Sequence, residues 1–226
     1  MRVIFNEELK AVADDLDRMA QDVRKAINGA GDALLNQNLE AAQAVIDGDI
    51  EIDALESSVI DQCVKLLAKQ NPVATDLRVV VSTLRLAATF ECMGDLGRHI
   101  AEAARRTYPA SPLPADAQPL FAEMQAFLDN VADQVVSMLT DRDTKTAEQI
   151  ILNDDKLDAL HKKTFELAQS EDWKGTNQQL IDVVLTGRFM ERLGDHAVSA
   201  ARRVVFIVSG FDPSKEPTRD EGTDID

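Results

Sequence analysis

The stretch MERLGDHAVSAARR, Met190–Arg203, restates a phrase used one hundred residues earlier in FECMGDLGRHIAEAARR, Phe90–Arg106. A shift of 100 carries the Glu-x-x-Gly-Asp motif of Glu91–Asp95 onto Glu191–Asp195. Both stretches also place apolar residues at spacings of three and four, which is typical of a helix with one buried face. The repeated motif therefore predicts two similar halves, each containing a helix of this kind.

Proline placement divides the chain between these halves. Four of the seven prolines lie in YPASPLPADAQP, Tyr108–Pro119, whereas 1–71, 73–108 and 120–212 contain none. Proline is disfavoured in helix interiors, so the long proline-free stretches leave room for long helices. We expect an all-α fold of two tandem three-helix bundles, with residues 1–108 as the first bundle, 109–119 as a Pro-rich linker, 120–210 as the second bundle and 211–226 as a flexible acidic tail.

Polar breaks in the apolar pattern predict the individual helices. In the first half, the first helix runs over about 7–35 and the second over about 39–69, after the Asn-Gln-Asn break. The third has Pro72 early in the helix and runs to about 106. In the second half they run over about 121–140, 147–169 and 180–208, with DRDTK and EDWKGTNQQ as the connections.

Composition and charge exclude several classes of function. The chain has 226 residues, with 24 Lys and Arg against 40 Asp and Glu, a formal net charge of −16. Such a surface repels nucleic acid phosphates and anionic lipid, so we expect no nucleic acid partner and no direct membrane insertion. The two cysteines, Cys63 and Cys92, are too few for a disulfide scaffold. The opening MRVIFNEELK lacks a signal-peptide core and no long apolar run follows, so we expect a cytoplasmic protein.

Each half carries two acidic pairs at i, i+4 spacing on consecutive predicted helices. Such a pair places both carboxylates on one side of a helix, where like charges are mildly destabilising. Four carboxylates converging from two helices would suit a hard divalent or trivalent cation that prefers oxygen ligands. The predicted metal ligands are Asp49, Asp53, Glu91 and Asp95 in the first half and Asp154, Asp158, Glu191 and Asp195 in the second, with Glu56 and His161 as candidate extra ligands.

Other interpretations compete with a metal site. In so acidic a chain an isolated i, i+4 pair is usually a solvated helix face, and only the repetition in register argues against that for the whole set. A carboxylate-bridged helical-bundle enzyme is the alternative function, although such enzymes use Glu-x-x-His pairs that this chain lacks. Cys92 is expected to be a packing residue, and Trp173 to anchor its loop against the bundle.

Two longer segments carry a resemblance to a known family. QNPVATDLRVVVSTLRLAATFECMGD, residues 70–95, and GRFMERLGDHAVSAARRVVFIVSG, residues 187–210, resemble the PhoU family of regulators associated with phosphate-specific transport. The likeness runs from about residue 5 to 210. It implies two three-helix bundles whose acidic motifs bind metal, iron or zinc above all and magnesium or manganese as further candidates, and it maps those motifs onto the eight carboxylates named above.

The resemblance also implies a function that composition and spacing do not show. The expected protein is not an enzyme but a negative regulator of the phosphate-starvation response. It would act on the ATPase subunit of the phosphate ABC transporter and on a phosphate-sensing histidine kinase, as a homodimer. One position departs from the family pattern: arginine usually follows the motif glutamate, and Arg192 matches whereas Cys92 does not. The first site is therefore expected to differ from the second in charge and affinity.

Overall fold

Seven helices make up the part of the chain that the structure, a computed structural model, describes, namely residues 2–211 with side chains from Phe5 onward. Within these residues no strand occurs, so the all-α prediction is confirmed. The tail expected at 211–226 lies outside the described residues except for the exposed Phe211. The helices are α1 Arg2–Asn36, α2 Leu39–Gln70, α3 Ala74–Thr107, α4 Gln118–Thr140, α5 Thr144–Leu152, α6 Asp154–Ala168 and α7 Asn177–Ser209.

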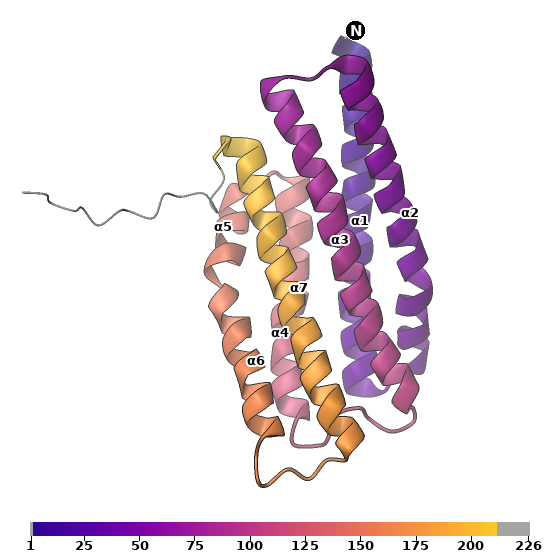
Figure 1. The fold of residues 1–226 in the computed structure, drawn as a ribbon, viewed down its shortest axis with the longest axis vertical. Coiled ribbons are helices and arrows are strands. Elements are labelled where there is room, and N and C mark those ends of the chain that lie inside the picture. Colours follow the sequence, from indigo (N-terminus) through magenta and orange to yellow (C-terminus); the bar gives the residue numbers. More distant parts are fainter. Residues whose placement is uncertain (1, 212–226) are drawn as a thin grey trace, which may run out of the picture.

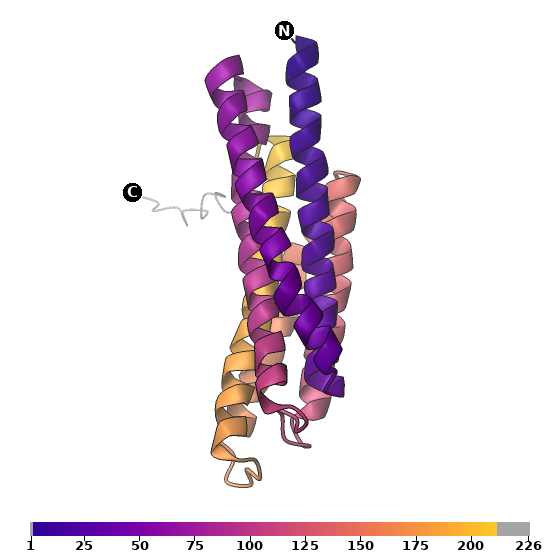
Figure 2. The same cartoon turned by 90° about the vertical axis from the view of Figure 1, so that its right-hand side faces the viewer.

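The helices form two bundles that stand side by side along the long axis of the molecule (Figure 1). One bundle contains α1, α2 and α3, and the other contains α4, α7 and the rod formed by α5 and α6. Among the described residues the two bundles meet through α1 with α4 and through α3 with α7. The view turned by 90° shows how narrow the paired bundles are in the other direction (Figure 2).

Local sequence explains where several helices begin and end. The Asn38 side chain accepts a hydrogen bond from the Ala41 N–H at 3.0 Å and so caps α2. Thr176 and Gln179 form a reciprocal capping box at the start of α7. Asn71 ends α2 in the left-handed conformation, with φ 49°. The right-handed helical conformation is disfavoured for the residue before a proline, and α3 begins only after Pro72 rather than around it as expected.

The expected continuous helix over 147–169 is broken at Asn153 into α5 and α6. The Asn153 side-chain amide donates to the Gln149 carbonyl at 2.8 Å, and the Asn153 backbone N–H donates to the same carbonyl at 3.1 Å. An asparagine side chain that bonds its own helix backbone in this way favours a helix end. Asp154 and Asp155 then occupy the first turn of α6, where a helix dipole favours negative charge.

One hydrophobic core runs through both bundles. Its largest fully buried side chains come from both halves of the chain and include Phe90 of α3 and Phe121 of α4. The stretch expected as a linker connects α3 to α4, although α4 already begins at Gln118 with Pro119 in its first turn. Because the core is shared, the division into two domains at 108 and 120 stays a prediction.

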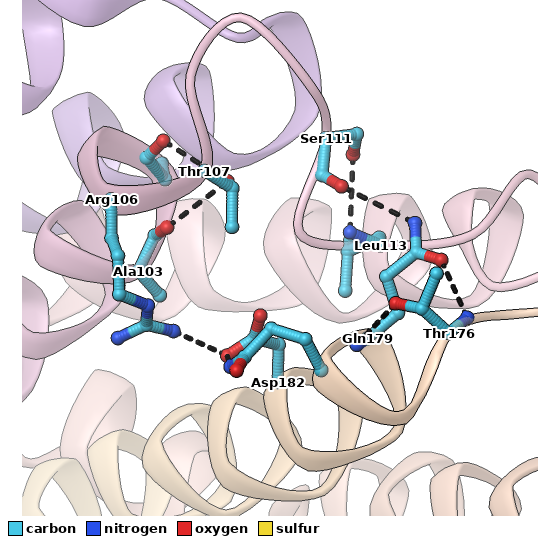
Figure 3. A network of polar contacts seen from close by, with 10 residues as sticks. Ala103, Arg106, Thr107, Ser111, Leu113, Thr176, Gln179 and Asp182 are labelled. Atoms are coloured by element: carbon cyan, nitrogen blue, oxygen red, sulfur yellow. Dashed lines mark hydrogen bonds and ion pairs between the residues drawn. The ribbon is translucent and has the colours of Figure 1, made fainter.

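The contacts between α3 and α7 reveal an approximate twofold relation between the halves. Near one end of the pair Arg106 binds Asp182, and near the other end Arg78 lies over the Phe206 ring, 5.9 Å from its centroid. Arg106 of α3 corresponds to Phe206 of α7 at a shift of 100 residues, and both lie near the C-terminal ends of their helices. The C-terminal part of each helix therefore contacts the N-terminal part of the other. Figure 3 shows the first of these junctions, where Gln179 also donates to the Ser111 carbonyl of the connecting segment.

Candidate metal centre

Close helix packing brings the acidic side chains of the second half together. A Cβ placed on Gly194 of α7 would lie 2.6 Å from Cδ2 of Leu157, the α6 residue next to Asp158. Glycine here lets α6 approach α7 more closely than alanine would allow. Gly94 plays the corresponding part against Ile52 and Asp49 of α2.

Three carboxylates of the second half converge on one point. Asp158 of α6 and Glu191 and Asp195 of α7 each offer one oxygen, and these atoms all lie within 4.8 Å of one another. Burial first, and then the charge of Asp195, raises the pKa of Glu191, whose side chain is only 12% exposed. The three ligands fit an oxygen-preferring cation, because such an ion would relieve both the repulsion and the cost of burial.

Asp154 and His161 flank this cluster. Burial and then the charges of Asp158 and Asp195 raise the pKa of Asp154 at the start of α6. Burial and then Arg188 lower the pKa of His161, a shift toward the neutral imidazole, which is the form that binds metals. Its Nε2 is buried without a hydrogen-bond partner. Neither residue belongs to the group of three converging ligands, so their roles as ligands stay predictions.

An arginine that sequence reasoning missed lies at the edge of the second cluster. Nη1 of Arg188 contacts both carboxylate oxygens of Glu191 at 2.5 Å. The two residues are three apart on α7, and the arginine side chain is 51% exposed. Water screens the arginine end of this pair, whereas the Glu191 side chain is only 12% exposed. Removing Arg188 would therefore leave a largely buried carboxylate unpaired unless another cation took its place.

The first-half cluster has a different arrangement, because Arg98 of α3 lies inside it. Its Nε donates to Asp49 Oδ2 and its Nη2 to Asp95 Oδ1, both at 2.5 Å, and its Nη1 donates to Glu102 Oε1 at 3.0 Å. Burial raises the pKa of Asp49, and the bonds from Arg98 oppose that shift. The sequence did contain a signal for this contact, since Arg98 follows Asp95 at helical i, i+3 spacing.

The remaining first-half candidates lie around Glu91. Burial raises the pKa of Glu91, a hydrogen bond with Cys92 lowers it, and Asp95, Glu56 and Asp53 raise it further. The structure thus brings the predicted acids into one electrostatic neighbourhood. Within the described residues, however, the one group of three or more converging ligands is in the second half. The guanidinium of Arg98 makes the first cluster a poor fit for a metal, so binding there stays a prediction.

Trp173, His99 and His196 do not belong to the group of converging ligands. Trp173 is partly buried and packs against the core, as expected for a loop anchor. His99 stacks on Phe189 across the α3–α7 contact, with ring centroids 5.3 Å apart. Burial first, and then Arg192, lowers the pKa of His196.

In the described part of the chain, none of the helices combines the length and the apolar character that a membrane-spanning helix needs.

Comparison with known proteins places this arrangement in a family. The PhoU domain model matches residues 16–104 and 121–204, once in each half. The phosphate-specific transport system accessory protein PhoU homolog 1 of Mycobacterium leprae is 35% identical over 96% of this chain and 97% of its own length. A PhoU homolog of Synechocystis is 30% identical over 92% of this chain and 93% of its own length. The crystal structure of PhoU from Pseudomonas aeruginosa superposes with a TM-score of 0.83 at 25% identity, covering 92% of this chain and all of that one.

Proposed function

The chain belongs to the PhoU family, and from that premise we propose that it is a cytoplasmic accessory protein of phosphate-specific transport that represses the phosphate-starvation response. The observation that carries this proposal is the match over both repeats and nearly the whole length of relatives named as accessory proteins. The alternative of a carboxylate-bridged enzyme finds no support, because the relatives are named as accessory proteins and no Glu-x-x-His pair occurs in the sequence.

The proposed mechanism is regulation by protein contact. The partners would be the ATPase subunit of a phosphate ABC transporter and a phosphate-sensing histidine kinase, and the protein would act as a homodimer. Its strongly acidic surface suits basic patches on such partners and disfavours nucleic acid. The rigid rods of the two bundles would present these surfaces in a fixed relative orientation, because a single core joins them.

A metal ion is the second component of the proposal. Asp158, Glu191 and Asp195 would hold it, with Asp154 and His161 beside them, and iron or zinc is the first candidate, followed by manganese or magnesium. The ion would neutralise the converging charges and tie α6 to α7. The support is the convergence of three carboxylates, of which Glu191 is paired with the half-exposed Arg188 of its own helix.

Gene deletion tests the regulatory role. We expect a deletion strain to express alkaline phosphatase and the phosphate transporter in rich phosphate, where the parent strain represses both. Reintroducing the intact gene should restore repression. Continued repression in a strain deleted for this gene and any second copy of it would contradict the proposal. Affinity capture from phosphate-replete cells should then recover the transporter ATPase or the kinase, which separates the two expected partners.

A further inference from the structure

We propose that Arg98 is a permanent internal cation of the first acidic cluster, so that this half is tied together without metal and only the second half takes an ion. The first part depends on the contacts of Arg98 alone. The second part rests on the metal site proposed above for Asp158, Glu191 and Asp195. The two repeats would then have diverged from two equivalent sites. In the first half an arginine connects the two acidic helices, and in the second half a metal ion connects them.

The guanidinium of Arg98 connects two helices. It bonds Asp49 on α2 and Asp95 and Glu102 on its own helix α3, all within 3.0 Å. Three of its nitrogens are used, each on a different carboxylate, which suits the fixed fork of a guanidinium. Asp49 is 7% exposed overall, so this ion pair is largely shielded from water. A cation that entered the cluster would have to displace Arg98 or lie beside its positive charge.

The equivalent position in the second half has no such group. The shift of 100 that superposes the two motifs carries Arg98 onto Val198, which is buried in the core. The arginine that the second half does use, Arg188, corresponds to Ala88 and bonds Glu191 on its own helix. The charge of Arg188 acts on His161 of α6, and the charge of Arg202 on Asp154 of α6. The second half nevertheless has no arginine at the position from which Arg98 connects α2 and α3.

The metal-free stability of matched variants tests the role of Arg98. Arg98→Met keeps a long side chain but leaves the buried Asp49 unpaired, and Arg18→Met makes the same change at the exposed ion pair with Asp15, where the arginine side chain is 70% exposed. With chelator present we expect the melting temperature to fall by about 5–15 °C for Arg98→Met. The fall for Arg18→Met should stay within about 2 °C. Equal shifts for the two variants would overturn the proposal.

A double variant distinguishes loss of the Arg98 charge from loss of its packing contacts. In Asp49→Asn/Arg98→Met both charges are gone, so the melting temperature in chelator should recover part of the loss seen in Arg98→Met. If the double variant melts no higher than the single variant, Arg98 acts by packing and the proposal fails. The comparison remains decisive if Arg98→Met is too unstable to purify, because a soluble double variant then shows the same recovery.

Equilibrium dialysis against zinc or manganese tests the difference between the halves. We expect Asp53→Asn/Glu91→Gln to bind as much metal as the unaltered chain, and Asp158→Asn/Glu191→Gln to lose at least tenfold in affinity. Loss of metal from the first-half variant would overturn the proposal of a metal-free first cluster. If the unaltered chain binds neither ion, the proposed metal site is contradicted, while the chelator experiments still decide the role of Arg98.

Discussion

A single carboxylate in this chain behaves according to the cation beside it. Asp49 and Asp154 stand just before corresponding Asp-Ala-Leu segments in the two halves. Arg98 bonds Asp49 directly, whereas the carboxylates of Asp158 and Asp195 act on Asp154 more strongly than the charge of Arg202 does. Burial raises the pKa of both. The same acidic pattern therefore occurs with two arrangements of positive charge, and one difference between them is Arg98 against Val198.

Replacing Asp195 with asparagine tests whether a metal ion compensates the charges of the second cluster. We expect Asp195→Asn to melt at the same or a higher temperature than the unaltered chain in chelator, because the change relieves repulsion from Glu191 and Asp158. Added zinc, iron or manganese should stabilise the unaltered chain through binding to its native state, and stabilise the variant much less. Thermal melting of both proteins with each metal and with chelator measures this. Identical metal-induced shifts would show that Asp195 is only a solvated surface residue.

Cys63 provides a prediction about pH. Burial raises the pKa of this thiol to about 11, and its side chain is fully buried in α2. Since the folded pKa lies above the unfolded value, the thiol's contribution to stability is present below pH 9 and is lost as the pH rises toward 11. We expect the free energy of unfolding to fall by about 2 kcal/mol more in the unaltered chain than in Cys63→Ala over that window. Urea unfolding of both at pH 8, 9, 10 and 11 measures the difference, and a constant gap would contradict it.

At this scale the sequence identified the acidic positions but not their counter-charges. The repeat at a shift of 100 was sufficient to select Glu191 and Asp195, and helical spacing was sufficient to place them on one side of α7. Whether an arginine enters such a cluster depends on how its long side chain is directed between two helices. That direction follows from packing, which spacing along one helix does not determine.

At the scale of the helix, α2 and its counterpart in the second half, the rod of α5 and α6, show how local sequence can interrupt a helix that the repeat predicts as continuous. α2 runs unbroken through Gly48, although glycine is a weak helix former. Its counterpart stops at Asn153, whose side chain bonds its own helix backbone. Helix propensity alone would have favoured a break in α2, at Gly48, instead of a break at Asn153. The sequence thus predicted the existence of both rods, while the position of the break depended on a side-chain hydrogen bond that propensity scales do not include.

Two glycines of the first half should respond in opposite ways to the same substitution. A Cβ at Gly48 would meet nothing within 4 Å, so Gly48→Ala should stabilise the protein by about 0.5–1 kcal/mol through helix propensity. A Cβ at Gly94 would lie 2.9 Å from Ile52 Cδ1 and 3.3 Å from Asp49 Oδ1. Gly94→Ala should therefore destabilise by about 1–2 kcal/mol despite the same gain in propensity. Chemical denaturation measures both, and shifts of the same sign would show that α2 and α3 are not packed as described.

At the scale of the whole molecule, the internal repeat predicts two similar bundles but does not say which helices join them. Every helix has one apolar stripe that faces its own bundle, and the choice of a neighbour in the other bundle depends on residues outside that stripe. The structure selects α1 with α4 and α3 with α7, and the last two helices contact each other with their reciprocal ends. Asp182 is one such residue, and nothing in the sequence distinguishes it from the other 39 acidic residues of the chain.

The ion pair of Arg106 and Asp182 is the polar contact between the bundles that is most open to test. Asp182 has a side-chain exposure of 2%, and besides Arg106 it receives a hydrogen bond from Gln178 at 3.1 Å (Figure 3). Arg106→Met would leave a buried carboxylate without its cation, so we expect a loss of about 2–3 kcal/mol and a fall in melting temperature of about 5–10 °C. Arg106→Met/Asp182→Asn should lose less, because no buried charge remains.

The neighbouring Arg105 supplies the control for that prediction. Its side chain is exposed and bonds Gln43 of α2 at 3.2 Å, within the first bundle, so Arg105→Met should change stability by no more than about 0.5 kcal/mol. Hydrogen exchange locates the effect: in Arg106→Met we expect faster exchange at the start of α7 and the end of α3, with the middle of α2 unaffected. Because one core joins the bundles, the variant should still unfold in a single transition. Equal losses for Arg105→Met and Arg106→Met, or a melt that separates into two steps, would mean that the junction of α3 and α7 does not couple the halves as the shared core requires.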